Sequence, residues 1–231
     1  MKLNGNEGRP FSILFRGCSF LAPYEAGVSA ALQELSPEIL KSASRIYGAS
    51  SGSVIATLTL CESGIGKIFQ DTKDLLNKHL PTNAHELVSG KLHVILTRVR
   101  DWRNVVVSEF ASREELIQAL LCSCFVPLCF GFLPPTYRGV WYIDGELAMW
   151  RANFVSRTTI TISPFAGEYD ICPRDGSAAF FTLQLSDCSG PVLYLWLPGH
   201  SRLLKKADCK FRGVQVCAYL HCQEKQASKD V

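Results

Sequence analysis

The sequence lacks any apolar segment long enough to cross a membrane. Its longest apolar stretch, residues 120–133, is interrupted by Pro127 and falls short of the ~20 residues that a membrane-spanning helix needs. The first ten residues are polar and glycine-rich, without the apolar region of a secretory signal, and no N-x-S/T glycosylation acceptor occurs. We therefore expect a cytoplasmic protein whose ten cysteines are mostly reduced.

Charge of one sign is also scarce, because the formal net charge at pH 7 is only +3. The arginines Arg98, Arg100 and Arg103 lie close together, but Trp102 is the one aromatic residue among them and makes no platform for stacked bases. This balance argues against a nucleic-acid partner.

Metal-ligand patterns are incomplete. Cys122, Cys124 and Cys129 are close in sequence, but the spacing C-x-C-x4-C brings no second ligand pair for zinc. We expect neither a metal nor another cofactor. What the chain does have is length and apolar content, with 231 residues of which 47% are hydrophobic, enough for a globular domain with a good core.

Apolar periodicity alternates between strands and helices along the chain, which predicts an α/β fold with a mostly parallel sheet and helices on both faces. Ser112 and Glu115 form a capping box that opens one helix. The other predicted helices are 23–35, 51–61 and 73–78. The predicted strands are 12–15, a strand ending at Tyr47, 92–97, 104–109, 140–143 and 158–163.

The most specific motif is G-x-S-x-G at Gly48–Gly52, between a predicted strand and a predicted helix. In a nucleophile elbow a strained turn exposes the serine, and the flanking glycines leave room for it. Ser50 is therefore a candidate nucleophile. The alternative is an ordinary helix start with Ser50 or Ser51 as N-cap.

A serine nucleophile needs a base, and the sequence offers two kinds. Asp144 follows the apolar strand 140–143 and precedes Gly145, a position where apolar neighbours would raise its pKa toward working pH. His200 and His221 come late enough in the chain for a Ser-His-Asp order. A turn aspartate and surface histidines are the alternative interpretations.

A loop of small residues follows the first predicted strand and leads into a helix that begins near Pro23 and Glu25, residues suited to a first helical turn. Such a loop can direct backbone N–H groups at an anion. Next to a serine elbow, this arrangement indicates an oxyanion hole.

The three motifs together resemble the patatin-like phospholipase family, in particular its animal adipose-triglyceride-lipase and adiponutrin branch and, within it, the member linked to skin-barrier ceramide acylation. The resemblance covers about residues 11 to 187 and continues between the motifs. Further segments of this kind include Pro134–Gly139 (PPTYRG) and Asp170–Pro173 (DICP). It implies a patatin-like three-layer α/β/α domain at 11–165, followed by a C-terminal extension at 166–231 whose tail from about 188 is unmatched and partly disordered.

The resemblance also implies roles for single residues. Ser50 would be the nucleophile and Asp144 the base of a Ser-Asp dyad, without a histidine. The backbone of Gly17, Cys18 and Ser19 would form the oxyanion hole, while Gly48, Gly52 and Gly145 are motif glycines.

Three departures from the family pattern are visible. Ser19 and Ala22 replace glycines of the oxyanion loop, and Glu146 follows Asp144-Gly145 where a small residue is expected. A second carboxylate there is expected to raise the pKa of Asp144 or to obstruct the acyl site. The stretch 61–81 is also shorter than the family pattern.

The implied function is a lipid acyl hydrolase or acyltransferase acting on neutral lipid esters such as triacylglycerol. The implied partners are a neutral lipid or phospholipid ester, a lipid-droplet or membrane surface to which the protein binds peripherally, and an activator protein. Two alternatives stay open. One is a catalytically weak relative that binds lipid surfaces or a partner, and the other is a Ser-His-Asp esterase that uses His200.

Overall fold

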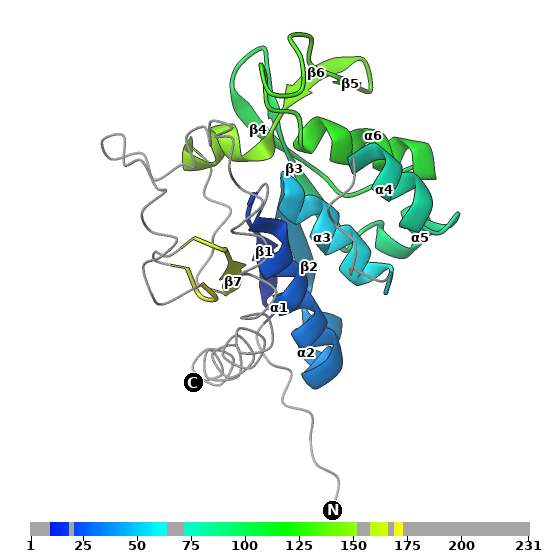
Figure 1. The fold of residues 1–231 in the computed structure, drawn as a ribbon, viewed down its shortest axis with the longest axis vertical. Helices are drawn as coiled ribbons and strands as arrows, with labels where there is room; N and C mark the ends of the chain where they lie inside the picture. The colour runs from blue at the N-terminus through cyan, green and yellow to red at the C-terminus, as the bar shows by residue number, and fades with distance from the viewer. Residues whose placement is uncertain (1–9, 19–20, 64–71, 152–157, 166–168, 173–231) are drawn as a thin grey trace, which may run out of the picture.

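A mixed sheet of seven strands forms the centre of the computed structural model, which describes residues 10–18, 21–63, 72–151, 158–165 and 169–172. The strand order is β5-β6-β3-β2-β1-β7, with β4 paired to β3. Four strands run parallel, namely β7 (Thr159–Ile162), β1 (Ser12–Phe15), β2 (Arg45–Ala49) and β3 (Leu92–Arg98). The predicted α/β fold with a mostly parallel sheet is confirmed (Figure 1).

The other three strands extend the sheet beyond β3. Both β4 (Arg103–Val107) and β6 (Val140–Ile143) pair antiparallel with β3, and the short β5 (Thr136–Tyr137) pairs with β6. Because Thr97 of β3 pairs with Ile143 of β6, the residue after β6 lies near the carboxyl ends of the parallel strands. Ligand sites of open α/β sheets lie at this edge.

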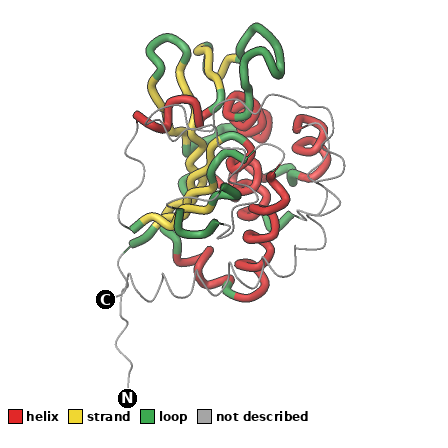
Figure 2. Tube along the Cα trace, turned by 60° about the vertical axis from the view of Figure 1, so that its left-hand side comes forward, coloured by secondary structure: helices red, strands yellow, loops and turns green. Residues whose placement is uncertain are grey.

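The α-helices cover one face of the sheet (Figure 2). Alternate strand residues such as Ile13 and Phe15 join apolar helix residues in one large buried cluster because successive strand side chains point to opposite faces. The helices are α1 (Ala22–Leu35), α2 (Pro37–Ser42), α3 (Ser51–Leu60), α4 (Thr72–His79), α5 (Ala84–Val88) and α6 (Arg113–Ser123).

The opposite face has a smaller apolar cluster made of Leu14, Ala49, Ile95 and Met149. Met149 belongs to the 3₁₀ helix η2 (Gly145–Arg151), which packs on β3 and β4. Within the described residues, η2 is the helical segment that packs on this second face, at β3 and β4. Periodicity did not predict η2, α2, α5 or β5, which are all short elements.

The predicted capping box of α6 is present in altered form. Ser112 is the N-cap, and its hydroxyl accepts a hydrogen bond from the backbone N–H of Glu115 at 3.1 Å. The Glu115 carboxylate accepts from the N–H of Ala111 rather than from that of Ser112. The box therefore closes one residue earlier than the standard motif.

The described residues end at Cys172. Most of the proposed extension at 166–231, including the tail from 188, lies outside them, and so do His200 and His221. Among the described helices, none combines the length and apolar character needed to cross a membrane.

Candidate active site

Ser50 lies at the sharp turn between β2 and α3. Its φ is +52° and its ψ is −136°, a strained combination for a residue with a side chain. The turn is held by Ser123 of α6, whose hydroxyl accepts from the backbone N–H of Ser50 at 2.9 Å and donates to the carbonyl of Ile95 at 2.8 Å. One hydroxyl thus ties the elbow to β3 and α6.

The flanking glycines are required because the backbone approaches closely. A Cβ on Gly52 would lie 2.5 Å from the carbonyl oxygens of Phe15 and Arg16. A Cβ on Gly48 would collide with the backbone of Ser53. The G-x-S-x-G pattern therefore has a packing reason at both glycines.

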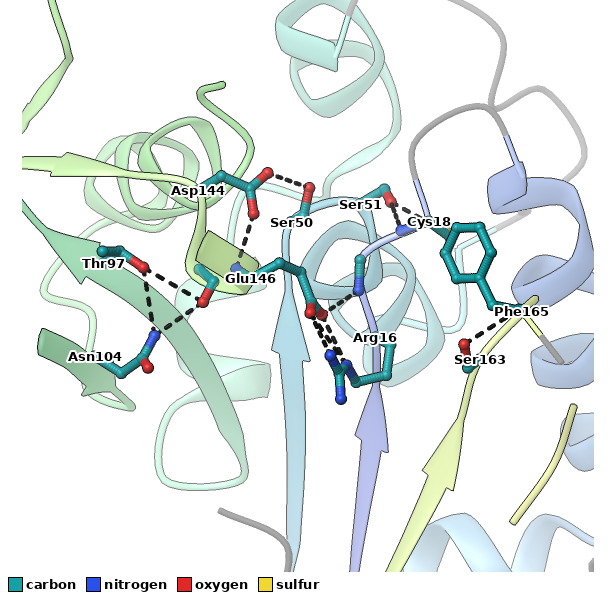
Figure 3. Close-up of polar contacts among 12 residues, drawn as sticks. Arg16, Cys18, Ser50, Ser51, Thr97, Asn104, Asp144, Glu146, Ser163 and Phe165 are labelled. Atoms are coloured by element: carbon teal, nitrogen blue, oxygen red, sulfur yellow. Dashed lines mark hydrogen bonds and ion pairs between the residues drawn. The ribbon is translucent and has the colours of Figure 1, made fainter. Parts of the chain in front are cut away.

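Asp144 points at Ser50 from the end of β6 (Figure 3). Its Oδ2 accepts a hydrogen bond from the Ser50 hydroxyl at 2.5 Å, and its Oδ1 accepts from the backbone N–H of Glu146 at 2.9 Å. The residue is only 3% exposed. Burial raises the pKa of Asp144 to about 7, against the lowering effect of these two hydrogen bonds, and the negative charge of Glu146 adds to the rise.

Residues that the sequence analysis did not single out hold the Asp144 segment in place. The backbone N–H of Asp144 donates to the carbonyl of Phe125 at 2.8 Å. The Gly145 carbonyl accepts from Asn104 Nδ2 at 2.8 Å and from the Thr97 hydroxyl at 3.4 Å. A Cβ on Gly145 would collide with the carbonyl of Ile95. The sequence marks Asn104 and Thr97 in one way, since each is a polar residue in a predicted strand that is otherwise largely apolar.

The backbone donors of the predicted oxyanion loop already have partners. Gly17 N donates to Oε1 of Glu146 at 2.5 Å, and Cys18 N donates to the Ser51 hydroxyl at 3.0 Å. Ser19, the third predicted donor, lies outside the described residues, whereas Ala22 begins α1. Side chains of the chain itself therefore engage both described donors (Figure 3).

Arg16 forms the other half of the Glu146 contact. Its Nε lies 3.1 Å from both carboxylate oxygens and its Nη2 lies 2.7 Å from Oε2, while the two side chains are only 14% and 6% exposed. Burial disfavours the charged guanidinium, but attraction to Glu146 outweighs it and raises the pKa of Arg16. Arg16 was not among the predicted site residues, although the sequence shows a single cation directly after an apolar strand.

Behind the loop lies Glu25, for which the sequence suggested a favourable interaction with the dipole of α1. The structure places Glu25 in the first turn of α1, where it is fully buried, and burial raises its pKa well above the usual value. Its Oε2 accepts from the Cys18 thiol at 3.4 Å, and its Oε1 has no hydrogen-bond partner among the described residues.

Within the described ranges, no group of three or more His, Cys, Asp or Glu side chains could hold a metal ion. Of the three clustered cysteines, Cys122 is buried, Cys124 is half-buried and Cys129 is exposed. The polar groups that meet at the candidate site are the Ser50 hydroxyl, the Asp144 and Glu146 carboxylates, the Arg16 guanidinium and the backbone N–H groups of Gly17 and Cys18.

Comparison with curated proteins places this chain in a family. The chain is 43% identical over 210 residues to a human omega-hydroxyceramide transacylase. This match covers 80% of this chain and 40% of the relative. It is 38% identical over 207 residues to human patatin-like phospholipase domain-containing protein 2, covering 78% of this chain and 41% of the relative. The chain belongs to the patatin-like phospholipase family.

A third relative in this family is human 1-acylglycerol-3-phosphate O-acyltransferase PNPLA3, 36% identical over 239 residues, with 90% of this chain and 48% of the relative covered. The patatin-like chain thus spans less than half the length of these three relatives. A comparison with models of known families found no match.

Proposed function

We propose that this patatin-like protein is a serine acyl hydrolase or acyltransferase for neutral lipid esters such as triacylglycerol. Ser50 is the nucleophile and Asp144 the base. The observation that carries the proposal is the 2.5 Å contact between the Ser50 hydroxyl and the buried Asp144 carboxylate. The transacylase and acyltransferase names of two relatives support acyl transfer as the reaction type.

In the proposed reaction, Ser50 Oγ attacks the ester carbonyl carbon while its proton moves to Asp144. The tetrahedral intermediate collapses when the ester C–O bond breaks, and Asp144 returns the proton to the departing alcohol. Water or an acceptor hydroxyl then attacks the acyl-serine, with Asp144 again taking and returning the proton. The pKa of Asp144, raised to about 7, suits this double role. We expect turnover to increase with pH through about 7 as the carboxylate ionises.

Covalent labelling with a fluorophosphonate probe, followed by intact-mass analysis, tests the nucleophile. Ser50→Ala should abolish labelling and Asp144→Asn should slow it strongly, whereas Ser63→Ala, at the end of the segment after α3, is the matched control and should label like the parent. His200→Ala and His221→Ala test the Ser-His-Asp alternative. Loss of labelling in either histidine variant, or persistent labelling in Ser50→Ala, contradicts the proposed dyad.

Peripheral binding to a lipid surface is the second part of the proposal. After α6 the chain forms an apolar loop, defined by Leu128, Phe130, Phe132 and Leu133, which are 68% to 85% exposed. The loop lies at the same end of the molecule as the turn between β3 and β4 (Figures 1 and 2). An exposed apolar patch of this size favours a docking surface.

The nearby charges favour one kind of surface. Arg100 of the β3–β4 turn and Arg103, the first residue of β4, are exposed. Cations beside apolar side chains suit phosphate headgroups above acyl chains. The start of the loop is also tied to the site, because the Phe125 carbonyl accepts from the backbone N–H of Asp144. We therefore assign the loop to the phospholipid coat of a neutral-lipid particle, and an activator protein remains a further predicted partner.

Flotation with a phospholipid-coated triolein emulsion tests the docking surface. Phe132→Glu should reduce the bound fraction at least several-fold, because a charge at the loop tip opposes insertion. Leu87→Glu introduces the same charge at an exposed leucine of α5 and should bind like the parent. Equal loss in both variants, or in neither, speaks against the apolar loop as the anchor.

A catalytically weak lipid-binding protein is the second candidate function. The observation that favours it is the Glu146 carboxylate at the Gly17 N–H, where the oxygen of a substrate carbonyl would have to bind. Surface binding would then persist without appreciable ester turnover.

A further inference from the structure

Glu146 reaches back across the site from the start of η2. Its carboxylate accepts from the backbone N–H of Gly17 and receives a fork of hydrogen bonds from Arg16 (Figure 3). Forked arginine–carboxylate contacts are among the stronger polar interactions and fix the carboxylate in direction as well as in position. The Glu146 side chain is therefore buried and fixed by Arg16 and Gly17.

Glu146 also lies close to Ser50, with Gly17 between them. A Cβ built on Gly17 would lie 2.5 Å from Glu146 Cγ and 2.9 Å from Ser50 Cβ. Gly17 is thus packed between the glutamate stem and the serine. A carbonyl oxygen bound at the Gly17 N–H would need the volume that the Glu146 carboxylate fills.

We propose that the Gly17 N–H and the Arg16 guanidinium form a carboxylate-binding cradle over Ser50, which Glu146 fills as an internal ligand. Arg16 and Glu146 together act as a lock on the oxyanion hole. The ligands that the cradle accepts when Glu146 is absent are small carboxylates and, by extension, the anionic head of a fatty acid. The consequence for turnover rests on the proposed function, whereas the cradle itself does not.

The second described donor is blocked less firmly. Cys18 N–H donates to the neutral Ser51 hydroxyl, which also contacts the Cys18 thiol at 3.1 Å. A hydroxyl can turn away by rotating one bond, but Glu146 must break a buried ion pair to leave. Glu146, rather than Ser51, therefore determines access to the oxyanion hole.

Butyrate binding tests the cradle without any chemistry at Ser50. In a Ser50→Ala background, Glu146→Gly should bind butyrate at least tenfold more tightly than the Glu146 parent, measured by calorimetry and by the rise in melting temperature. Adding Arg16→Ser should remove the gained binding. Asp101→Gly frees Arg98 from an ion pair elsewhere and is the matched control, with no gain expected. Equal butyrate binding by the parent and Glu146→Gly overturns the inference.

Ester turnover with Ser50 intact tests the lock. Misplacing one oxyanion donor typically costs about 100- to 1000-fold, so Glu146→Gly should accelerate turnover at least tenfold. Because this variant leaves Arg16 buried without its partner, Arg16→Ser/Glu146→Gly provides a second route in which both charges are absent. The lock is overturned if the probe labels the parent at Ser50 and the folded double variant turns over ester no faster than the parent. Gained butyrate binding without labelling or turnover in any variant would instead reject the proposed function and leave the cradle standing.

Discussion

The two sides of the candidate site satisfy their polar groups in different ways. On the Ser50 side, a strained turn and a buried carboxylate meet in a 2.5 Å hydrogen bond, and Ser123 holds the turn. On the Gly17 side, the backbone donor is engaged by the chain's own Glu146 and by an ion pair to Arg16. One side joins a serine hydroxyl to a buried carboxylate, and on the other side a carboxylate of the same chain occupies the backbone donor.

This difference separates the presence of a nucleophile from the capacity for turnover. A Ser-Asp contact requires two correctly placed side chains, which the elbow and β6 provide. Stabilisation of an oxyanion requires donors that are available when the charge develops. A G-x-S-x-G motif therefore predicts the first property better than the second.

The largest effect is expected on the Ser50 side. Ser50→Ala and Asp144→Asn should each lower turnover of a short-chain ester by about 10⁴-fold or more, and the double variant should be little worse, since parts of one catalytic unit are not additive. These losses are measured most sensitively in a Glu146→Gly background, where we expect the starting turnover to be higher. Additive losses would show that Asp144 acts independently of Ser50.

Arg16→Ser should be the most destabilising change on the Gly17 side. It leaves the Glu146 carboxylate buried without its cation, a situation that typically costs about 3–5 kcal/mol. Urea unfolding should show this loss, and the added change Glu146→Gly should recover a large part of it. Similar stability of Arg16→Ser and the parent would mean that the ion pair contributes little.

Asp144→Asn should make the protein more stable at pH 8 than the parent. The pKa of Asp144 is about 7 in the folded protein and about 3.9 in an unfolded chain, so the folded state retains a proton that the unfolded state has lost. The parent therefore loses stability as pH rises from about 4 to 7. Asparagine does not titrate, and we expect an advantage of roughly 2–4 kcal/mol at pH 8 that disappears near pH 4. Thermal melts across this range test the sign, and an advantage that grows toward low pH would contradict it.

Ser123→Ala should have the smallest effect of the four. It leaves the backbone N–H of Ser50 without its acceptor, which typically costs about 1–3 kcal/mol for a buried donor. Turnover should fall along with stability because the elbow loses a positioning contact. The matched change Ser63→Ala should affect neither property. An unchanged melting temperature in Ser123→Ala would show that the Ser50 turn does not depend on the Ser123 hydroxyl.

The sequence predicted the long, periodic elements within a few residues. The strand at Ser12–Phe15 was predicted with its observed bounds, and the helix after Ser50 ends at Leu60 instead of Cys61. Periodicity suffices for such elements because one repeating face is buried. It failed for α2, α5 and η2, which have six, five and seven residues and are too short to show the i, i+3, i+4, i+7 pattern of an amphipathic helix.

For the candidate site, local motifs single out Ser50, Asp144 and the loop at Gly17 as candidates, because strand–turn–helix patterns are local in sequence. The sequence also pointed to Glu146 as a second carboxylate near Asp144. It did not reveal the partnership with Arg16, which lies 130 positions earlier in the chain. Contacts at that separation depend on strand order, and no local pattern encodes them.

The buried Arg16–Glu146 pair also constrains the order in which such a sequence can change. A glutamate at 146 without Arg16, or an arginine at 16 without Glu146, would pass through a protein with an uncompensated buried charge. Neither residue is easily gained or lost alone. Among related sequences the two positions should therefore vary together, with a small residue at 146 accompanied by an uncharged residue at 16, and that joint variation would record when a glutamate came to occupy the Gly17 N–H.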